Sequence, residues 1–72
     1  MEKRQRRLLV ADSVNTEIAR QGWTRERLAG SLGVPLASFE RMLSGDTAID
    51  VDTLDEIAAA LGVAIDSLLG AE

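Results

Sequence analysis

The sequence predicts an all-α protein, a compact bundle of about five short helices. Apolar residues recur three and four positions apart, which is the spacing of one helix face, and no stretch alternates as a half-buried strand does. Glycines follow these stretches at the points where helices end. With 72 residues, 46% of them hydrophobic, the chain has the composition of one globular domain rather than of a disordered segment.

The first predicted helix covers residues 8–19. Ala11, Val14 and Ile18 fall on one face of it, and Gly22 ends it. The charged residues before it contribute no apolar periodicity. We therefore predict a flexible basic arm over residues 1–7 and a single domain over residues 8–70.

The second helix is predicted to run from a Thr24 N-cap to about Leu32. Trp23 and Leu28 stand on either side of this start at the spacing of a hydrophobic staple, which fixes how the chain enters a helix. Gly33 follows as a residue that adopts positive φ at little cost. The pattern therefore predicts a sharp turn into the next helix.

The third helix is predicted over residues 36–44. Pro35 has a fixed φ that suits a first helical turn, and we expect it to open the helix. Phe39 and Met42 lie three apart and should face the core. Gly45 ends the helix.

Two further helices complete the predicted bundle. Asp50 is a good N-cap for the fourth, with Ile49 and Leu54 in staple positions, and Gly62 ends it. The remaining apolar residues suffice for a short fifth helix within residues 63–69.

Charge is distributed unevenly along the chain. Residues 1–45 hold all eight basic and five acidic side chains, a net +3, whereas residues 46–72 hold seven acids and no base, a net −7. The overall charge of −4 therefore conceals a basic half suited to a polyanion. The alternative is a solvated surface on which the charges are segregated by accident.

The composition excludes several classes of function. Because cysteine and histidine are absent, the chain has no thiol nucleophile, no imidazole base and no zinc site of the usual ligands, so we expect neither an enzyme nor a metal protein. Cofactors and small-molecule ligands are not predicted. No apolar run approaches the roughly 18 residues of a membrane span, and we expect a soluble protein of the cytoplasm, bacterial or that of a phage's host.

Residues 22–63 resemble the helix-turn-helix domain of lambda-repressor and Cro-type (XRE-like) regulators. The resemblance is carried by Trp23, Thr24, Leu28, Ala29, Leu32, Gly33, Val34, Phe39, Met42, Gly45, Leu54, Ile57, Ala58, Leu61, Gly62 and Val63. It implies a lambda-repressor-like fold and a sequence-specific transcriptional regulator, a repressor of phage or bacterial type. Such a protein would read the major groove of double-stranded operator DNA with its third helix.

The same resemblance assigns base reading to four residues of the third helix, Leu36, Ala37, Ser38 and Arg41. Arg41 is the strongest candidate because a guanidinium bonds guanine O6 and N7 together. Two alternatives remain open. For Arg41, the alternative is a surface ion pair with a neighbouring acid. For Leu36, it is a partly buried position at the start of the helix.

Phosphate contacts are assigned by the resemblance to the start of the second helix, the loop after the third and the basic arm. The residues concerned are Thr24, Arg25, Ser44, Gly45, Thr47, Lys3, Arg4, Arg6 and Arg7. Turn formation alone would explain Gly45 equally well. The arm has the alternative of a solvated terminus.

A homodimer is expected, at least on DNA, because one recognition helix contacts few base pairs. The resemblance points to Ile65, Leu68 and Leu69 as the dimer surface, with core packing as their alternative. The competing function is a protein-interaction or antitoxin-like module built on the same fold, whose acidic second half would meet a basic partner.

Overall fold

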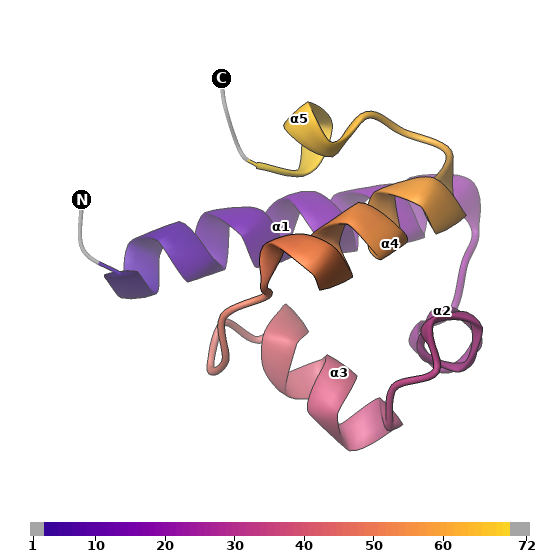
Figure 1. Ribbon diagram of the computed structural model, residues 1–72, viewed down its shortest axis with the longest axis horizontal. Coiled ribbons are helices and arrows are strands. Elements are labelled where there is room, and N and C mark those ends of the chain that lie inside the picture. The colour runs from indigo at the N-terminus through magenta and orange to yellow at the C-terminus, as the bar shows by residue number, and fades with distance from the viewer. Residues whose placement is uncertain (1–2, 70–72) are drawn as a thin grey trace.

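The structure, a computed structural model, describes residues 3–69 and contains helices and no strands within that range. They are α1 (Lys3–Gln21), α2 (Arg25–Leu32), α3 (Leu36–Leu43), α4 (Val51–Leu61) and α5 (Ile65–Leu68) (Figure 1). The predicted all-α class and the order of five helices are confirmed.

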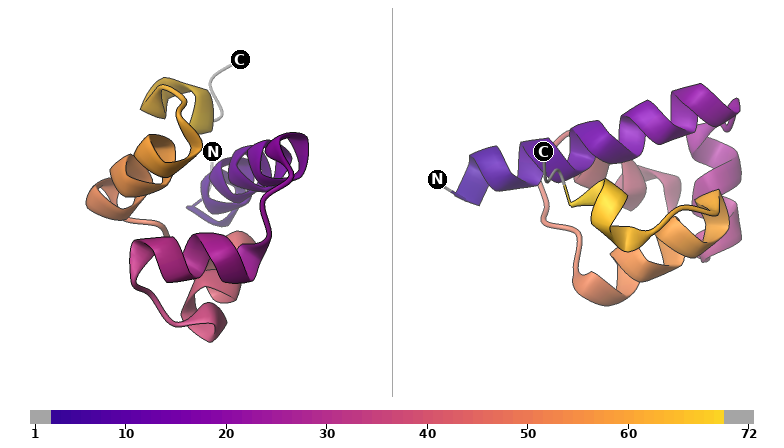
Figure 2. Two further views of the ribbon diagram at one scale, coloured as in Figure 1. Left: turned by 90° about the vertical axis from the view of Figure 1, so that its right-hand side faces the viewer. Right: turned by 90° about the horizontal axis from the view of Figure 1, so that it is seen from above.

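The helices form a small bundle in which α1 and α4 lie side by side. α2 packs on both α3 and α4, and α5 packs on both α1 and α4. The views agree that α3 and α5 lie on opposite sides of the α1–α4 pair (Figures 1 and 2). One side of the molecule is therefore formed by α2, the turn and α3, and the other by α5.

A single core joins the helices. Its largest fully buried side chains come one from each helix: Val14, Leu28, Phe39, Ile57 and Leu68. Because every helix contributes to one cluster, displacement of any helix would expose the shared core to solvent.

The first helix begins earlier in the structure than the sequence predicted. α1 begins at Lys3, five residues before the predicted start at Leu8, and so includes residues 3–7, which the sequence indicated as an arm. The residues concerned are lysine, arginine and glutamine, which are strong helix formers even without an apolar face. Periodicity alone therefore placed the boundary too late.

Side-chain caps begin α2 and α4 as predicted. The Thr24 hydroxyl accepts a hydrogen bond from the Arg27 N–H at 3.1 Å, and the Asp50 carboxylate accepts one from the Thr53 N–H at 3.0 Å. These caps satisfy donors that the first turn of a helix leaves unpaired. Hydrogen bonding to Thr53 also holds the pKa of Asp50 below its usual range.

The turn between α2 and α3 corrects the predicted role of Pro35. Gly33 takes the left-handed conformation (φ +73°), and Val34 N–H then donates to the Ala29 carbonyl at 3.1 Å. Pro35 is extended, with ψ 141°, so it is the N-cap of α3 rather than its first helical residue. Its carbonyl accepts the first helical hydrogen bond, from Phe39 N–H at 3.0 Å.

Gly45 and Gly30 should respond in opposite directions to alanine. Gly45 has φ +84°, and a Cβ there would lie 2.6 Å from Leu8 Cδ2. We expect Gly45→Ala to cost about 1–2 kcal/mol for the left-handed backbone, with a further cost from moving Leu8. Gly30 is helical, and an added Cβ would meet no atom within 4 Å beyond its own helix backbone, so Gly30→Ala should stabilise by about 0.5–1 kcal/mol.

Urea unfolding followed by circular dichroism would measure both changes. Gly62→Ala is the matched control, because Gly62 has φ +71° but open space around an added Cβ. A loss at Gly45 no larger than that at Gly62 would contradict the importance of the Leu8 contact. Destabilisation by Gly30→Ala would contradict the helical account of that position.

Candidate nucleic-acid interface

The outer face of α3 is open to solvent. Ala37, Ser38, Glu40 and Arg41 are exposed, whereas Phe39 and Leu43 bury the inner face in the core. α2 and α1 both pack against α3 and hold it in place. α3 lies at the edge of the molecule (Figure 1), with its apolar side packed in the core and its other side open to solvent.

The start of α2 carries a hydrogen-bonded arginine. Arg25 is exposed, and its Nη2 donates to Asn15 Oδ1 on α1 at 3.0 Å. Asn15 Nδ2 in turn donates to the carbonyl of Leu43, the last residue of α3, at 3.1 Å. One half-buried amide therefore connects α1, α2 and α3.

The arrangement of α2, a glycine turn and a braced α3 is that of a helix-turn-helix unit. The sequence profile of the helix-turn-helix family matches residues 17–68, which is well over half of the chain. The chain belongs to the lambda-repressor-type helix-turn-helix family. No curated protein and no solved structure matches it.

Members of this family bind DNA, and α2 and α3 form its helix-turn-helix unit. The resemblance seen in the sequence and the predicted fold are confirmed by this match. Within residues 3–69, no helix is both long and apolar enough to cross a membrane.

Three of the four predicted base-reading residues lie exposed on α3: Ala37, Ser38 and Arg41. Leu36 differs, because it is half-buried and packs against the core. The alternative reading of Leu36 as a partly buried residue at the helix start therefore fits the structure better. Little of its side chain is left for a thymine methyl.

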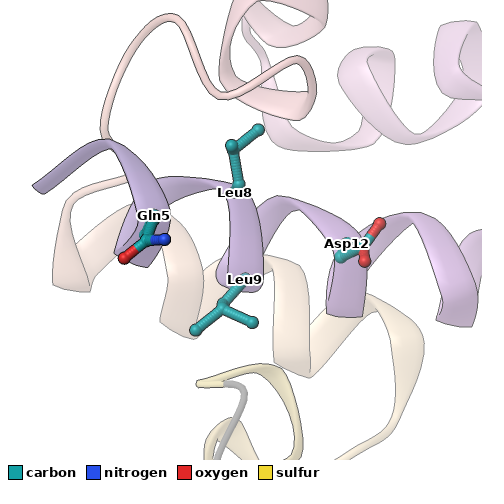
Figure 3. Close-up of a pocket in the computed structure, with 4 residues that line it drawn as sticks. All are labelled: Gln5, Leu8, Leu9 and Asp12. Carbon is teal, nitrogen blue, oxygen red and sulfur yellow. The ribbon is translucent and has the colours of Figure 1, made fainter. Parts of the chain in front are cut away.

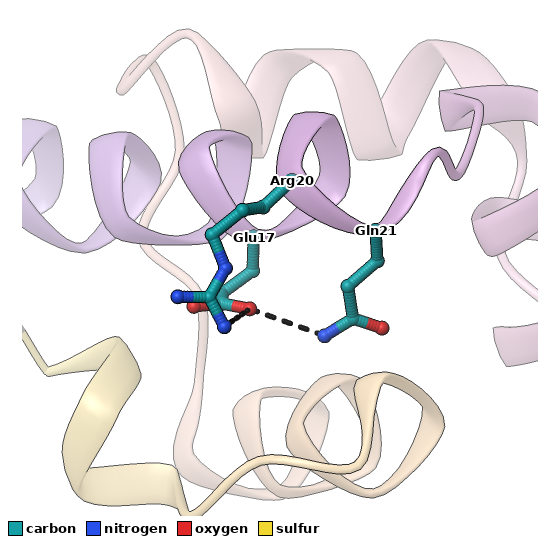
Figure 4. A network of polar contacts seen from close by, with 3 residues as sticks. All are labelled: Glu17, Arg20 and Gln21. Atoms are coloured by element: carbon teal, nitrogen blue, oxygen red, sulfur yellow. Dashed lines mark hydrogen bonds and ion pairs between the residues drawn. The ribbon is translucent and has the colours of Figure 1, made fainter.

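Arg41 has no acidic partner among the described side chains. The one ion pair within 4.0 Å in that part of the chain joins Arg20 and Glu17 on α1, at 3.6 Å. Gln21 Nε2 donates to the same Glu17 oxygen at 3.1 Å, and all three side chains project from α1 toward the side of α4 and α5 (Figure 4). Arg20 is thus paired away from α3, whereas Arg41 is open to solvent.

The loop after α3 keeps only one of its predicted phosphate donors. Gly45 is buried and its N–H donates to the Met42 carbonyl at 3.2 Å, while the Ser44 hydroxyl donates to the Arg41 carbonyl at 3.0 Å. Both donors are used inside the turn, as the turn-forming alternative for Gly45 requires. Thr47 is exposed, and its hydroxyl has no hydrogen-bond partner in the described chain.

The basic residues at the start of α1 lie beside this loop. Arg6 and Arg7 line a shallow hollow of about 180 Å³ together with Val10, Ala48 and Ile49. The Arg7 Nε is buried without a hydrogen-bond partner in the described residues. Lys3 and Arg4, also predicted as phosphate contacts, have their backbone in α1, but their side chains fall outside the described part of the chain.

The three residues predicted for a dimer surface differ in how exposed they are. Leu68 is fully buried in the core, so its alternative assignment, core packing, describes it, and it offers no surface to a second copy. Ile65 is half-buried, and Leu69 is 49% exposed. Only part of the predicted surface is therefore accessible.

The sequence did not single out Leu9, which is 41% exposed on α1. Leu9 points toward α5, whereas its neighbour Leu8 points toward the loop that holds Gly45 (Figure 3). Both leucines line a shallow hollow of about 370 Å³ with Gln5 and Asp12. Leu9 lies outside the three-and-four spacing of Ala11, Val14 and Ile18, and a large apolar side chain at such a position was the available signal.

Proposed function

We propose that this protein is a sequence-specific transcriptional regulator of the repressor type that inserts α3 into the major groove of operator DNA. The observation that carries the proposal is the division of α3 into a buried face held by Phe39 and an open face that presents Ser38 and Arg41. A helix fixed in this way brings its polar side chains to base edges. The site of action would be the cytoplasm of a bacterium or of a phage's host.

Backbone contacts would come from positive and hydroxyl groups around α3. Arg25, next to the Thr24 cap, stands where unpaired helix N–H groups already favour an anion. Arg6, Arg7 and Thr47 gather near the loop that follows α3. Such contacts set the register of a protein on DNA, while base contacts set its specificity.

We further infer that the regulator binds as a homodimer. One recognition helix covers few base pairs, and two helices reach neighbouring half-sites when they are about 34–36 Å apart. Leu69 and Leu9 are exposed large apolar side chains on the side of α1 and α5, and Ile65 is partly accessible there. This side lies opposite α3, so pairing through it would leave both recognition helices free.

Selection of bound sequences from a random duplex pool at moderate salt tests the proposal. We expect a short palindromic motif whose half-sites lie one helical turn apart. Binding to it should weaken with salt at a log–log slope of about −0.9 per phosphate contact. A single half-site would contradict the dimer.

Failure to enrich any sequence, even at low salt, would overturn DNA reading. It would favour instead the protein-interaction or antitoxin-like module. In that case the acidic side chains exposed on α4, Asp52, Asp55 and Glu56, would be the surface for a basic protein.

A further inference from the structure

Asn15 is a polar residue in the middle of α1 whose side chain bonds to two other helices. It is half-buried and follows the fully buried Val14. Its amide meets Arg25, the first residue of α2, and Leu43, the last residue of α3. By contrast, the hydroxyls of Ser13 and Thr16 donate to carbonyls one turn back in α1, and Gln21 donates to Glu17 within the same helix.

The chemistry of the partners fixes how the amide is oriented. A guanidinium only donates and a backbone carbonyl only accepts, so Oδ1 must face Arg25 and Nδ2 must face Leu43. Neither an aspartate nor a leucine side chain could satisfy both partners. The Leu43 carbonyl is also one of the last four in a helix, which receive no hydrogen bond from an N–H of that helix.

We propose that Asn15 is a positioning residue that holds the Arg25 guanidinium ready for a DNA phosphate and ties that guanidinium to the end of the recognition helix. This inference rests on the proposed function of the protein. Asn15 itself need not touch DNA.

The physical gain is preorganisation. Arginine carries large rotamer entropy, and a side chain that is ordered before binding loses less of it in the complex. Within the described residues, Asn15 is the only hydrogen-bond partner of the Arg25 guanidinium. Asn15 accepts from one N–H group of the Arg25 guanidinium, and the remaining N–H groups stay available for phosphate oxygens. The second bond links the position of that charge to α3.

A double-mutant cycle on the selected duplex tests the inference, with Asn15→Ala, Arg25→Ala and the double variant. We expect Asn15→Ala alone to weaken binding about fivefold, the loss typical of one hydrogen bond. In the Arg25→Ala background the same change should weaken binding less than about twofold, because its target is gone. The salt slope should fall by about one in Arg25→Ala and partly in Asn15→Ala.

Ser13→Ala is the matched control, because it removes a half-buried hydroxyl of α1 that bonds only to the Leu9 carbonyl. It should leave binding and the salt slope unchanged. Binding is measured below the melting temperature of every variant, so that loss of folding is not counted as loss of affinity.

Three results would overturn the inference. Equal loss from Asn15→Ala in both backgrounds would mean that Asn15 acts only on the fold, and no loss at all would mean that Arg25 needs no support. Either result leaves the proposed function standing. A wild-type chain that enriches no duplex would instead overturn the proposed function, and this inference with it.

Discussion

Phe39→Ala is expected to cost about 3–5 kcal/mol, the range for deleting a buried aromatic side chain. Phe39 is fully buried and is the only phenylalanine of the chain. A domain of 72 residues has a total stability of about 4–11 kcal/mol. The variant should therefore lose between about a quarter and all of its stability.

Thermal and urea unfolding followed by circular dichroism would measure this loss. Val51→Ala is the control, since 72% of that side chain is already exposed and its removal should cost less than about 1 kcal/mol. If Phe39→Ala and the wild type unfold at the same urea concentration, the five helices do not share the core described above.

Much of this fold could be predicted because local chemistry and apolar spacing agree. Thr24 and Asp50 cap α2 and α4 as their positions indicate, and Phe39 faces the core as its spacing from Met42 requires. Each feature acts over four or five residues, so the sequence carries it directly.

The features that the sequence did not predict depend on residues distant in the chain or on residues without an apolar pattern. The start of α1 at Lys3 follows from helix propensity and not from an apolar face. The contact of Leu8 with Gly45 exists only because α1 packs beside the end of α3. Neither is visible in the spacing of residues along the chain.

The site shows the same division. Exposure of Ala37, Ser38 and Arg41 follows from the helical period once Phe39 is placed inside. The sequence left two roles open for Leu36 and for Leu68, because an apolar residue near a helix end suits a surface or a core equally well. Asn15 was missed because its partners lie 10 and 28 residues away.

Arg41 is expected to carry the largest share of base discrimination. Arg41→Ala should reduce the preference for the selected motif by about 1–3 kcal/mol, the value of one bidentate contact to guanine, and relax the motif at one position. Its guanidinium is exposed and has no acidic partner among the described side chains, so it pays little to leave its place for a base.

Arg41→Lys separates base reading from charge. Lysine keeps the positive charge but lacks the planar fork of donors, so the motif should relax nearly as far as in Arg41→Ala while the salt slope stays at the wild-type value. Arg20→Ala is the control, because Arg20 pairs with Glu17 on the α4–α5 side of α1. If both Arg41 variants select the wild-type motif, the bases are read by other residues, and Arg41 serves only the backbone. If Arg41→Ala lowers the salt slope by about one while Arg41→Lys keeps both the wild-type slope and the wild-type motif, the guanidinium contributes through a phosphate and not through guanine.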